Sequence, residues 1–156
     1  MNYADRRNER ILRNVLARIG GEESESVARF LSRYGNIRTK SSYAVHLDLY
    51  FRWLKDKGNF RTPDQLILDN LACVFKSDAM DVKTKRRHTD WLGEYVNAYL
   101  LEEGRSESKR RAASAAICEF YKKNDSRLFG DFSVASFLRY LDVAARNMRQ
   151  ARSKAG

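Results

Sequence analysis

The sequence predicts an all-α protein. It contains one proline and eight glycines among 156 residues, so few positions interrupt a helix. Apolar residues recur three or four positions apart along most of the chain, and stretches that alternate apolar with polar residues are rare. We therefore expect a compact orthogonal helical bundle with one extra helix at the N-terminal end and another at the C-terminal end.

Two helices are predicted before Gly35. The first spans about Asp5 to Ile19, where five arginines lie outside an apolar stripe and two glycines follow. The second is short, runs from about Ser24 to Tyr34 and stops at Gly35. Their apolar stripes consist of Ile11, Leu12, Val15, Leu16 and Ile19, and of Val27, Phe30, Leu31 and Tyr34.

A third helix is predicted from about Ile37 to Lys57, with Asn36 as its N-cap and Gly58 as its terminator. Two apolar stripes make it apolar over most of its circumference, as is typical of a central helix. These stripes consist of Tyr43, Leu47, Tyr50, Phe51 and Leu54, and of Val45, Leu49 and Trp53.

The start of a fourth helix is marked by Thr62-Pro63-Asp64-Gln65. Threonine is a capping residue, proline suits the first helical position, and a glutamine three residues after the cap completes a capping box. This helix is predicted to run to about Lys76. We expect it to bury Leu66, Leu68, Leu71, Val74 and Phe75.

Three further helices are predicted from residue 83 onward. A basic run leads into a fifth helix that carries Trp91, Tyr95 and Tyr99 and ends at Gly104. Ser106 caps a sixth, rich in alanine, and a seventh spans about residues 133–149. Within a single domain we distinguish an N-terminal basic helix (1–22), a helical core (23–124) and a C-terminal helix with a basic tail (125–156).

The charge balance indicates a polyanionic partner. The chain carries 30 Lys and Arg against 20 Asp and Glu, a formal net charge of +10, which attracts a phosphate backbone. We expect no membrane association, because no run is apolar enough to span a bilayer and the start does not resemble a signal peptide. Cys73 and Cys118 are expected to be reduced core residues, as in a cytoplasmic protein.

Two helix starts are candidate phosphate contacts. In each, a helix ends at glycine (Gly35 or Gly104), a capping residue follows (Asn36 or Ser106), and small hydroxyl and basic residues open the next helix. Helix N-termini attract phosphates through unpaired N–H groups and the helix dipole. The candidates are Arg38, Thr39, Ser41, Ser42, Ser108, Lys109, Arg110 and Arg111, together with the basic run Lys83, Lys85, Arg86 and Arg87. The alternative interpretation is that the caps only begin helices and the charges are solvated.

Nothing in the sequence indicates catalysis. His46 and His88 have no second ligand at metal-binding spacing, and no phosphate-binding glycine loop or hydrolase motif occurs. The aromatic residues fall on helix-spaced stripes, which favours the core over base stacking. We expect no metal, no cofactor and no enzymatic activity.

Three stretches together resemble a known family. They are Gly35 to Leu54, which contains Asn36-Ile37-Arg38-Thr39 and Trp53-Leu54; Thr62-Pro63-Asp64-Gln65-Leu66; and Ala115-Ala116-Ile117-Cys118-Glu119-Phe120-Tyr121. Their order and spacing resemble the SAM-like core-binding domain of tyrosine recombinases, the phage-type integrases, in a form similar to archaeal members. The resemblance covers about Val27 to Lys122. It departs from the family at Lys109, where threonine is usual, and in the longer connector from Met80 to His88.

The resemblance implies that this chain binds double-stranded DNA as one half of a clamp. In the family, a separate catalytic domain carries an Arg, Lys, His-x-x-Arg and Tyr constellation. Here the third residue after His46 is Leu49 and the third after His88 is Trp91, so neither histidine begins such a motif. The implied partners are DNA, a separate or excised catalytic domain and further copies on DNA, and the implied location is the nucleoid.

Two alternatives remain at this stage: a helical protein-interaction module and a stand-alone DNA-binding regulator. The first predicts no salt-sensitive DNA binding. RNA binding is disfavoured because the sequence offers no exposed aromatic platform.

Overall fold

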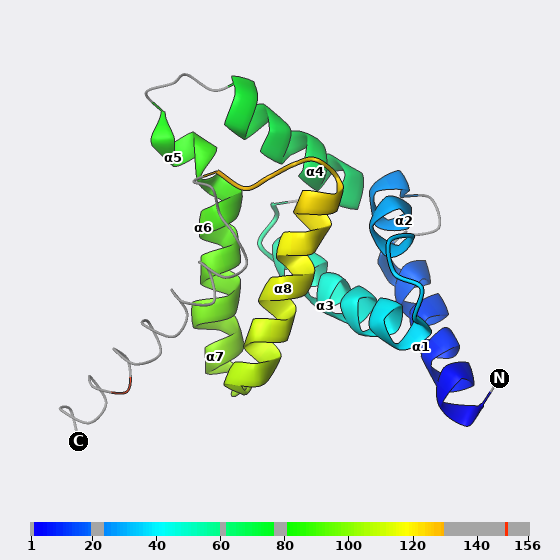
Figure 1. The fold of residues 1–156 in the computed structure, drawn as a ribbon. Helices are drawn as coiled ribbons and strands as arrows, with labels where there is room; N and C mark the ends of the chain where they lie inside the picture. The colour runs from blue at the N-terminus through cyan, green and yellow to red at the C-terminus, as the bar shows by residue number, and fades with distance from the viewer. Residues whose placement is uncertain (1, 20–23, 60–61, 77–80, 130–148, 150–156) are drawn as a thin grey trace.

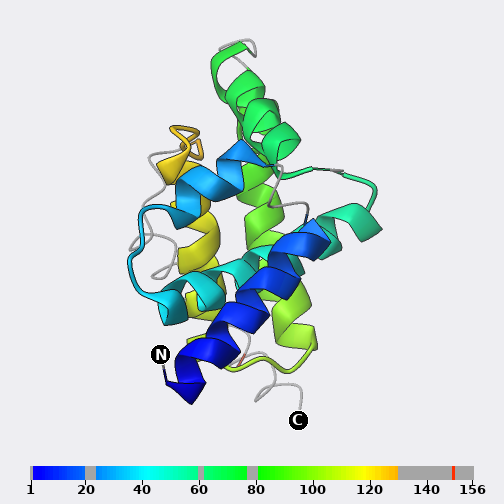
Figure 2. The same ribbon diagram turned by 90° about the vertical axis from the view of Figure 1, so that its right-hand side faces the viewer.

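A computed structural model describes residues 2–19, 24–59, 62–76, 81–129 and 149, and every regular element in these ranges is helical. The helices pack into one bundle (Figures 1 and 2), which confirms the predicted all-α class. The elements are α1 (Tyr3–Ile19), α2 (Glu25–Leu31), α3 (Ile37–Asp56), α4 (Pro63–Leu71), the π-helical turn η1 (Ala72–Lys76), α5 (Val82–Lys85), α6 (Arg87–Glu94), the π-helical turn η2 (Tyr95–Tyr99), α7 (Leu100–Glu102) and α8 (Glu107–Lys123).

Three predicted N-caps begin helices as expected. Each capping side chain accepts a backbone N–H from the first turn, which satisfies a donor that has no partner inside the helix. The bonds run from Arg38 N to Asn36 Oδ1 (2.8 Å), from Gln65 N to Thr62 Oγ1 (3.2 Å) and from Lys109 N to Ser106 Oγ (3.2 Å). At the other ends of helices, Gly58 and Gly104 follow α3 and α7 with φ angles of +74° and +76°, a left-handed conformation that favours glycine.

The central element is α3, which packs against both α1 and α8. Figure 1 shows α3 crossing α8 at a steep angle, and Figure 2 shows α1 passing obliquely across α3. On α3, Leu47, Tyr50 and Leu54 are completely buried, and α1 contributes Val15 and Ile19 to the same core. The additional N-terminal helix is therefore part of the bundle rather than an appendage.

An aromatic cluster joins α2, α3 and α8. The Phe120 ring meets Phe30 edge-on with centroids 5.7 Å apart and Phe51 at 5.6 Å. The prediction that aromatic side chains fill the core is confirmed for Tyr50, Trp53, Tyr95 and Phe120, whereas Tyr99 is 38% exposed.

The predicted buried face of α4 is partly wrong. Leu66 is buried as expected, but Leu68 is 66% exposed and Phe75 on η1 is 75% exposed. The face that enters the core carries Leu66, Ile67, Asn70 and Cys73 instead. Leu68 and Phe75, seven residues apart, share the opposite face of this helix.

The fifth predicted helix is divided into several elements. Asp81 caps the short helix α5 by accepting the Thr84 N–H at 3.1 Å, and α6 begins as a separate helix at Arg87. It continues through η2 into α7 and ends before Gly104, as predicted. The seventh predicted helix, over residues 133–149, lies outside the described residues apart from Arg149.

Both cysteines are buried, as predicted, and no disulfide joins them. Within the described part of the chain, no helix combines the length and the apolar character that crossing a membrane requires.

Candidate nucleic-acid interface

Some of the predicted contact residues near the start of α3 are exposed to solvent, and one of them is buried. Arg38 and Ser42 are exposed, Thr39 is half-buried, and Ser41 is 4% exposed. Ser41 precedes Ala44, Leu47 and Phe51 on the face that enters the core. A phosphate cannot reach its hydroxyl in this arrangement, so we remove Ser41 from the interface.

The first turn of α8 is similar. Ser108 and Lys109 are exposed, but Arg110 is only 6% exposed. Arg111 is half-buried and its Nη2 lies 2.7 Å from Glu107 Oε1, so that carboxylate offsets its charge. Arg110 shares a helix face with Ser114 and Ile117, both completely buried, and we therefore remove it from the interface as well.

The basic run from Lys83 to Arg87 lies away from the N-terminal ends of α3 and α8. Figures 1 and 2 both place α5 at the upper end of the bundle, whereas the N-terminal ends of α3 and α8 lie in the lower half. Two cations of this run form ion pairs with carboxylates. Arg86 Nε lies 3.6 Å from Asp90 Oδ1, and Arg87 Nη1 lies 3.7 Å from Asp69 Oδ2. The Lys85 ammonium is 5.6 Å from the centre of the Phe129 ring, and Lys83 is exposed.

Arg38 and Lys109 differ from Arg86 and Arg87. Neither forms an ion pair with a described residue, and both are exposed in the first turn of a capped helix. Lys83 shares these properties, but its helix, α5, has only four residues. Lys109 also lies close enough to α3 to act on His46. Burial lowers the pKa of His46 below its usual 6.5, and the Lys109 charge lowers it further. The start of α8 therefore places the positive charge of Lys109 beside α3, the helix whose first turn carries Arg38.

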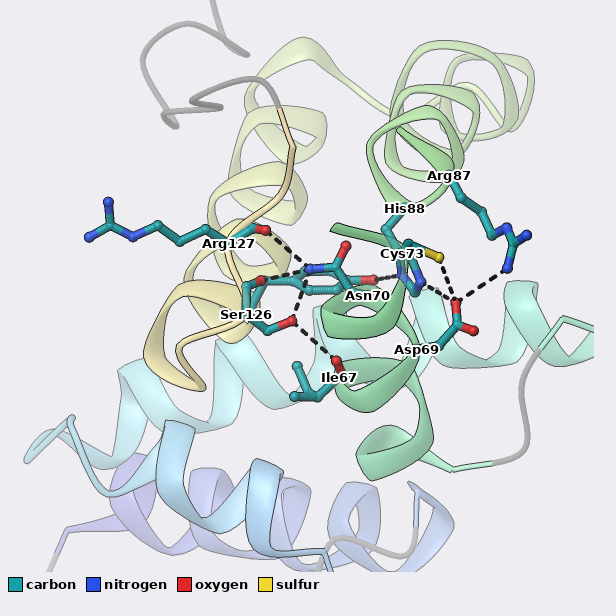
Figure 3. A network of polar contacts seen from close by, with 9 residues as sticks. Ile67, Asp69, Asn70, Cys73, Arg87, His88, Ser126 and Arg127 are labelled. Carbon is teal, nitrogen blue, oxygen red and sulfur yellow. Dashed lines mark hydrogen bonds and ion pairs between the residues drawn. The ribbon is translucent and has the colours of Figure 1, made fainter. Parts of the chain in front are cut away.

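A buried polar network was not predicted from the sequence (Figure 3). His88 is completely buried, with Nε2 2.6 Å from Asp69 Oδ2 and Nδ1 2.8 Å from the Tyr121 hydroxyl. Cys73 Sγ lies 3.6 Å from the same Asp69 oxygen. One signal existed: Asp69 and Cys73 are four residues apart, the spacing that places two side chains on one helix face.

A neighbouring set of bonds holds the chain after α8 against α4. Asn70 is completely buried, and its Nδ2 donates to Ser126 Oγ at 2.9 Å and to the carbonyl oxygens of Ser126 and Arg127 at 3.0 and 3.2 Å (Figure 3). The Ser126 hydroxyl donates in turn to the Ile67 carbonyl at 3.2 Å. These bonds explain why a polar residue lies on the core face of α4.

The His88 environment leads to a pH prediction. Burial lowers the pKa of His88 to about 4, although the Asp69 carboxylate acts in the opposite direction. A histidine in the unfolded chain takes up its proton near 6.5, so between pH 6.5 and 4 only the unfolded chain binds that proton. We expect the free energy of unfolding to decrease as the pH falls through this window, by about 2 kcal/mol from His88 at pH 5.

Urea unfolding at pH 7 and pH 5, in buffer that contains a chelator, measures this loss. A His88→Gln variant lacks the titrating group and should lose less stability between the two pH values. Equal losses in the variant and the original protein would show that His88 is not the source.

No protein-family model, no curated protein and no solved structure matches this chain.

Proposed function

We propose that this chain binds duplex DNA and contacts phosphates with the N-terminal ends of α3 and α8. The observation that carries the proposal is the pair of exposed cations without ion-pair partners among the described residues, Arg38 and Lys109, each in the first turn of a capped helix. Helix dipole and side-chain charge favour an anion at the same place. The excess of positive charge over the whole chain supports the same partner class.

The role proposed for this binding is that of the core-binding half of a site-specific tyrosine recombinase. The resemblance in order and spacing from about Val27 to Lys122 supports it. In this proposal the chain positions DNA by phosphate contacts, and strand cleavage belongs to a separate catalytic domain. The chain itself is not an enzyme in this proposal. Self-association on DNA and a place in the nucleoid belong to the same proposal.

Fluorescence anisotropy over a salt series tests DNA binding directly. Labelled random duplex should bind better than single-stranded DNA of equal length. If at least two phosphates are neutralised, the logarithm of the binding constant should fall with the logarithm of salt concentration with a slope of about −2 or steeper. No binding to duplex at low salt would overturn the proposal.

Charge reversal locates the interface. The Arg38→Glu, Lys109→Glu variant should bind duplex DNA roughly a hundredfold more weakly at low salt and with a shallower salt slope. Lys83→Glu, Arg86→Glu is the matched control, because it changes the net charge equally at the opposite end of the bundle. Far-ultraviolet circular dichroism confirms that both variants stay helical. Equal weakening in the two variants would mean that net charge, and not this surface, attracts DNA.

One observation favours a second candidate function, a protein-interaction module. Leu68 and Phe75 are largely exposed on one face of α4 and η1, and Val82 is 49% exposed on α5, which contacts η1. Exposed apolar side chains gathered on one surface are typical of protein-binding sites. Absence of DNA binding together with intact folding would favour this candidate.

A further inference from the structure

Three side chains with different ligand atoms converge where α4 and η1 meet α6. Asp69 lies on α4, Cys73 on η1 and His88 in the first turn of α6. One ligand atom from each lies within 4.8 Å of the others (Figure 3). We propose that Asp69, Cys73 and His88 bind a zinc ion.

The chemistry of these three groups selects the metal. Thiolate and imidazole ligands suit zinc, whereas magnesium and calcium prefer oxygen ligands alone. Zinc also accepts a carboxylate oxygen, so all three groups are ordinary zinc ligands. The residues come from separate parts of the chain, and the ion would tie α4 and η1 to α6.

Both distances from Asp69 to the other two ligand atoms are close to those of a zinc site. Zinc–ligand bond lengths in a tetrahedral site place sulfur and oxygen ligands about 3.6 Å apart, and nitrogen and oxygen ligands about 3.4 Å apart. Cys73 Sγ already lies 3.6 Å from Asp69 Oδ2. His88 Nε2 is 2.6 Å from the same oxygen, so these two atoms must separate by somewhat less than 1 Å. Cys73 lies in a π-helical turn, a feature frequent at functional sites.

Tyr121 orients the histidine ligand from the other side. Its hydroxyl lies 2.8 Å from His88 Nδ1, and its side chain is 1% exposed. Histidines that bind metals usually make such a second contact, which fixes the ring and its tautomer. The hydroxyl suits both states, because it donates to Nδ1 when Nε2–H bonds to Asp69 and accepts from Nδ1–H when Nε2 binds zinc.

Zinc binding releases one proton, which comes from Cys73. The neutral imidazole keeps its single proton, which moves from Nε2 to Nδ1 as the Nε2 lone pair forms the zinc–nitrogen bond. The Cys73 S–H bond breaks, its proton goes to solvent, and the thiolate forms the zinc–sulfur bond. Asp69 binds as a carboxylate.

The charges around the three ligands and the solvent exposure of Asp69 both allow a zinc ion to bind. Arg87 lies 3.7 Å from Asp69 Oδ2 and opposes a second cation, but its side chain is 44% exposed and can turn to solvent once zinc neutralises the carboxylate. The Asp69 side chain is 31% exposed, so an ion can enter past it.

Cobalt substitution tests the proposal without reference to DNA. The full chain, without a histidine tag, is freed of metal with EDTA, dialysed and titrated with Co²⁺. We expect one equivalent to produce visible bands of tetrahedral cobalt and an ultraviolet thiolate-to-cobalt charge-transfer band. One equivalent of Zn²⁺ should remove both. Absence of the charge-transfer band in the original protein would overturn the proposal.

Matched variants identify the ligands. Cys73→Ser should abolish the charge-transfer band, and Cys118→Ser, which removes the other buried thiol, should retain it. Asp69→Asn and His88→Gln should weaken Co²⁺ binding by more than the tenfold to hundredfold, roughly, expected for Tyr121→Phe. His46→Gln, which removes the histidine outside the proposed site, is the control for His88→Gln.

A band that persists in Cys73→Ser or disappears in folded Cys118→Ser would overturn the proposal. If Cys73→Ser does not fold, thermal unfolding tests the zinc site instead. Zn²⁺ should raise the melting temperature of the original protein and of Cys118→Ser. It should leave that of Asp69→Asn unchanged, and an equal rise in Asp69→Asn would contradict the site.

Discussion

Replacing Phe120 by alanine is expected to destabilise the fold by about 4 kcal/mol. The Phe120 ring is completely buried and contacts Phe30 of α2 and Phe51 of α3, so its removal leaves a cavity where three helices meet. The loss combines the transfer free energy of the ring with the cost of that cavity. Urea unfolding monitored by circular dichroism measures it.

Phe75→Ala is the matched control, because it removes the same side chain from a position that is 75% exposed. We expect a change within about 0.5 kcal/mol. Similar losses for the two variants would contradict the packing described for α4 and α8.

Removing both cations around Asp48 is expected to cost about 3 kcal/mol. The Asp48 residue is 3% exposed, and its Oδ2 lies 3.3 Å from Arg18 Nη2 and 3.0 Å from Arg52 Nη2. In an Arg18→Met, Arg52→Met variant the carboxylate remains buried without either partner, and burial of an isolated charge is unfavourable. Each single variant keeps one cation and should lose much less.

Two further variants test the cause. Adding Asp48→Asn to the double variant removes the isolated charge and should restore most of the lost stability. Lys55→Met, which removes a cation from the same surface hollow without an ion pair to Asp48, should change little. If Asp48→Asn restores nothing, the loss comes from the packing of the arginine stems instead.

The sequence predicted the helix ends correctly where hydrogen bonds between neighbouring residues determine them. Asn36, Thr62 and Ser106 begin their helices through bonds to N–H groups two or three residues away, so neighbouring residues suffice to predict them. The left-handed Gly58 and Gly104 are local in the same sense. For this reason the starts of α3 and α8, and with them the candidate interface, could be placed in advance.

The predictions failed where contacts between distant segments of the chain determine which side chains are buried and paired. The α4 segment has apolar residues on two faces, and the packing of α2 against it accompanies burial of the face with Leu66 rather than the one with Leu68. His88 meets Asp69 across 19 positions and Tyr121 across 33, so local spacing could indicate only the Asp69 and Cys73 pair of this network. The burial of Ser41 and Arg110 could be predicted from the sequence. Ser41 shares a helix face with Ala44, three positions further on, and Arg110 shares one with Ala113 and Ile117, three and seven positions further on.

The packing of α1 has a practical consequence for anyone who prepares shorter versions of this protein. This helix supplies Val15 and Ile19 to the core and Arg18 to the buried Asp48. A fragment that starts beyond Ile19 would expose the surface of α3 that α1 covers, and such fragments tend to aggregate. Shortened versions for crystallisation, labelling or fusion should therefore keep the first helix intact.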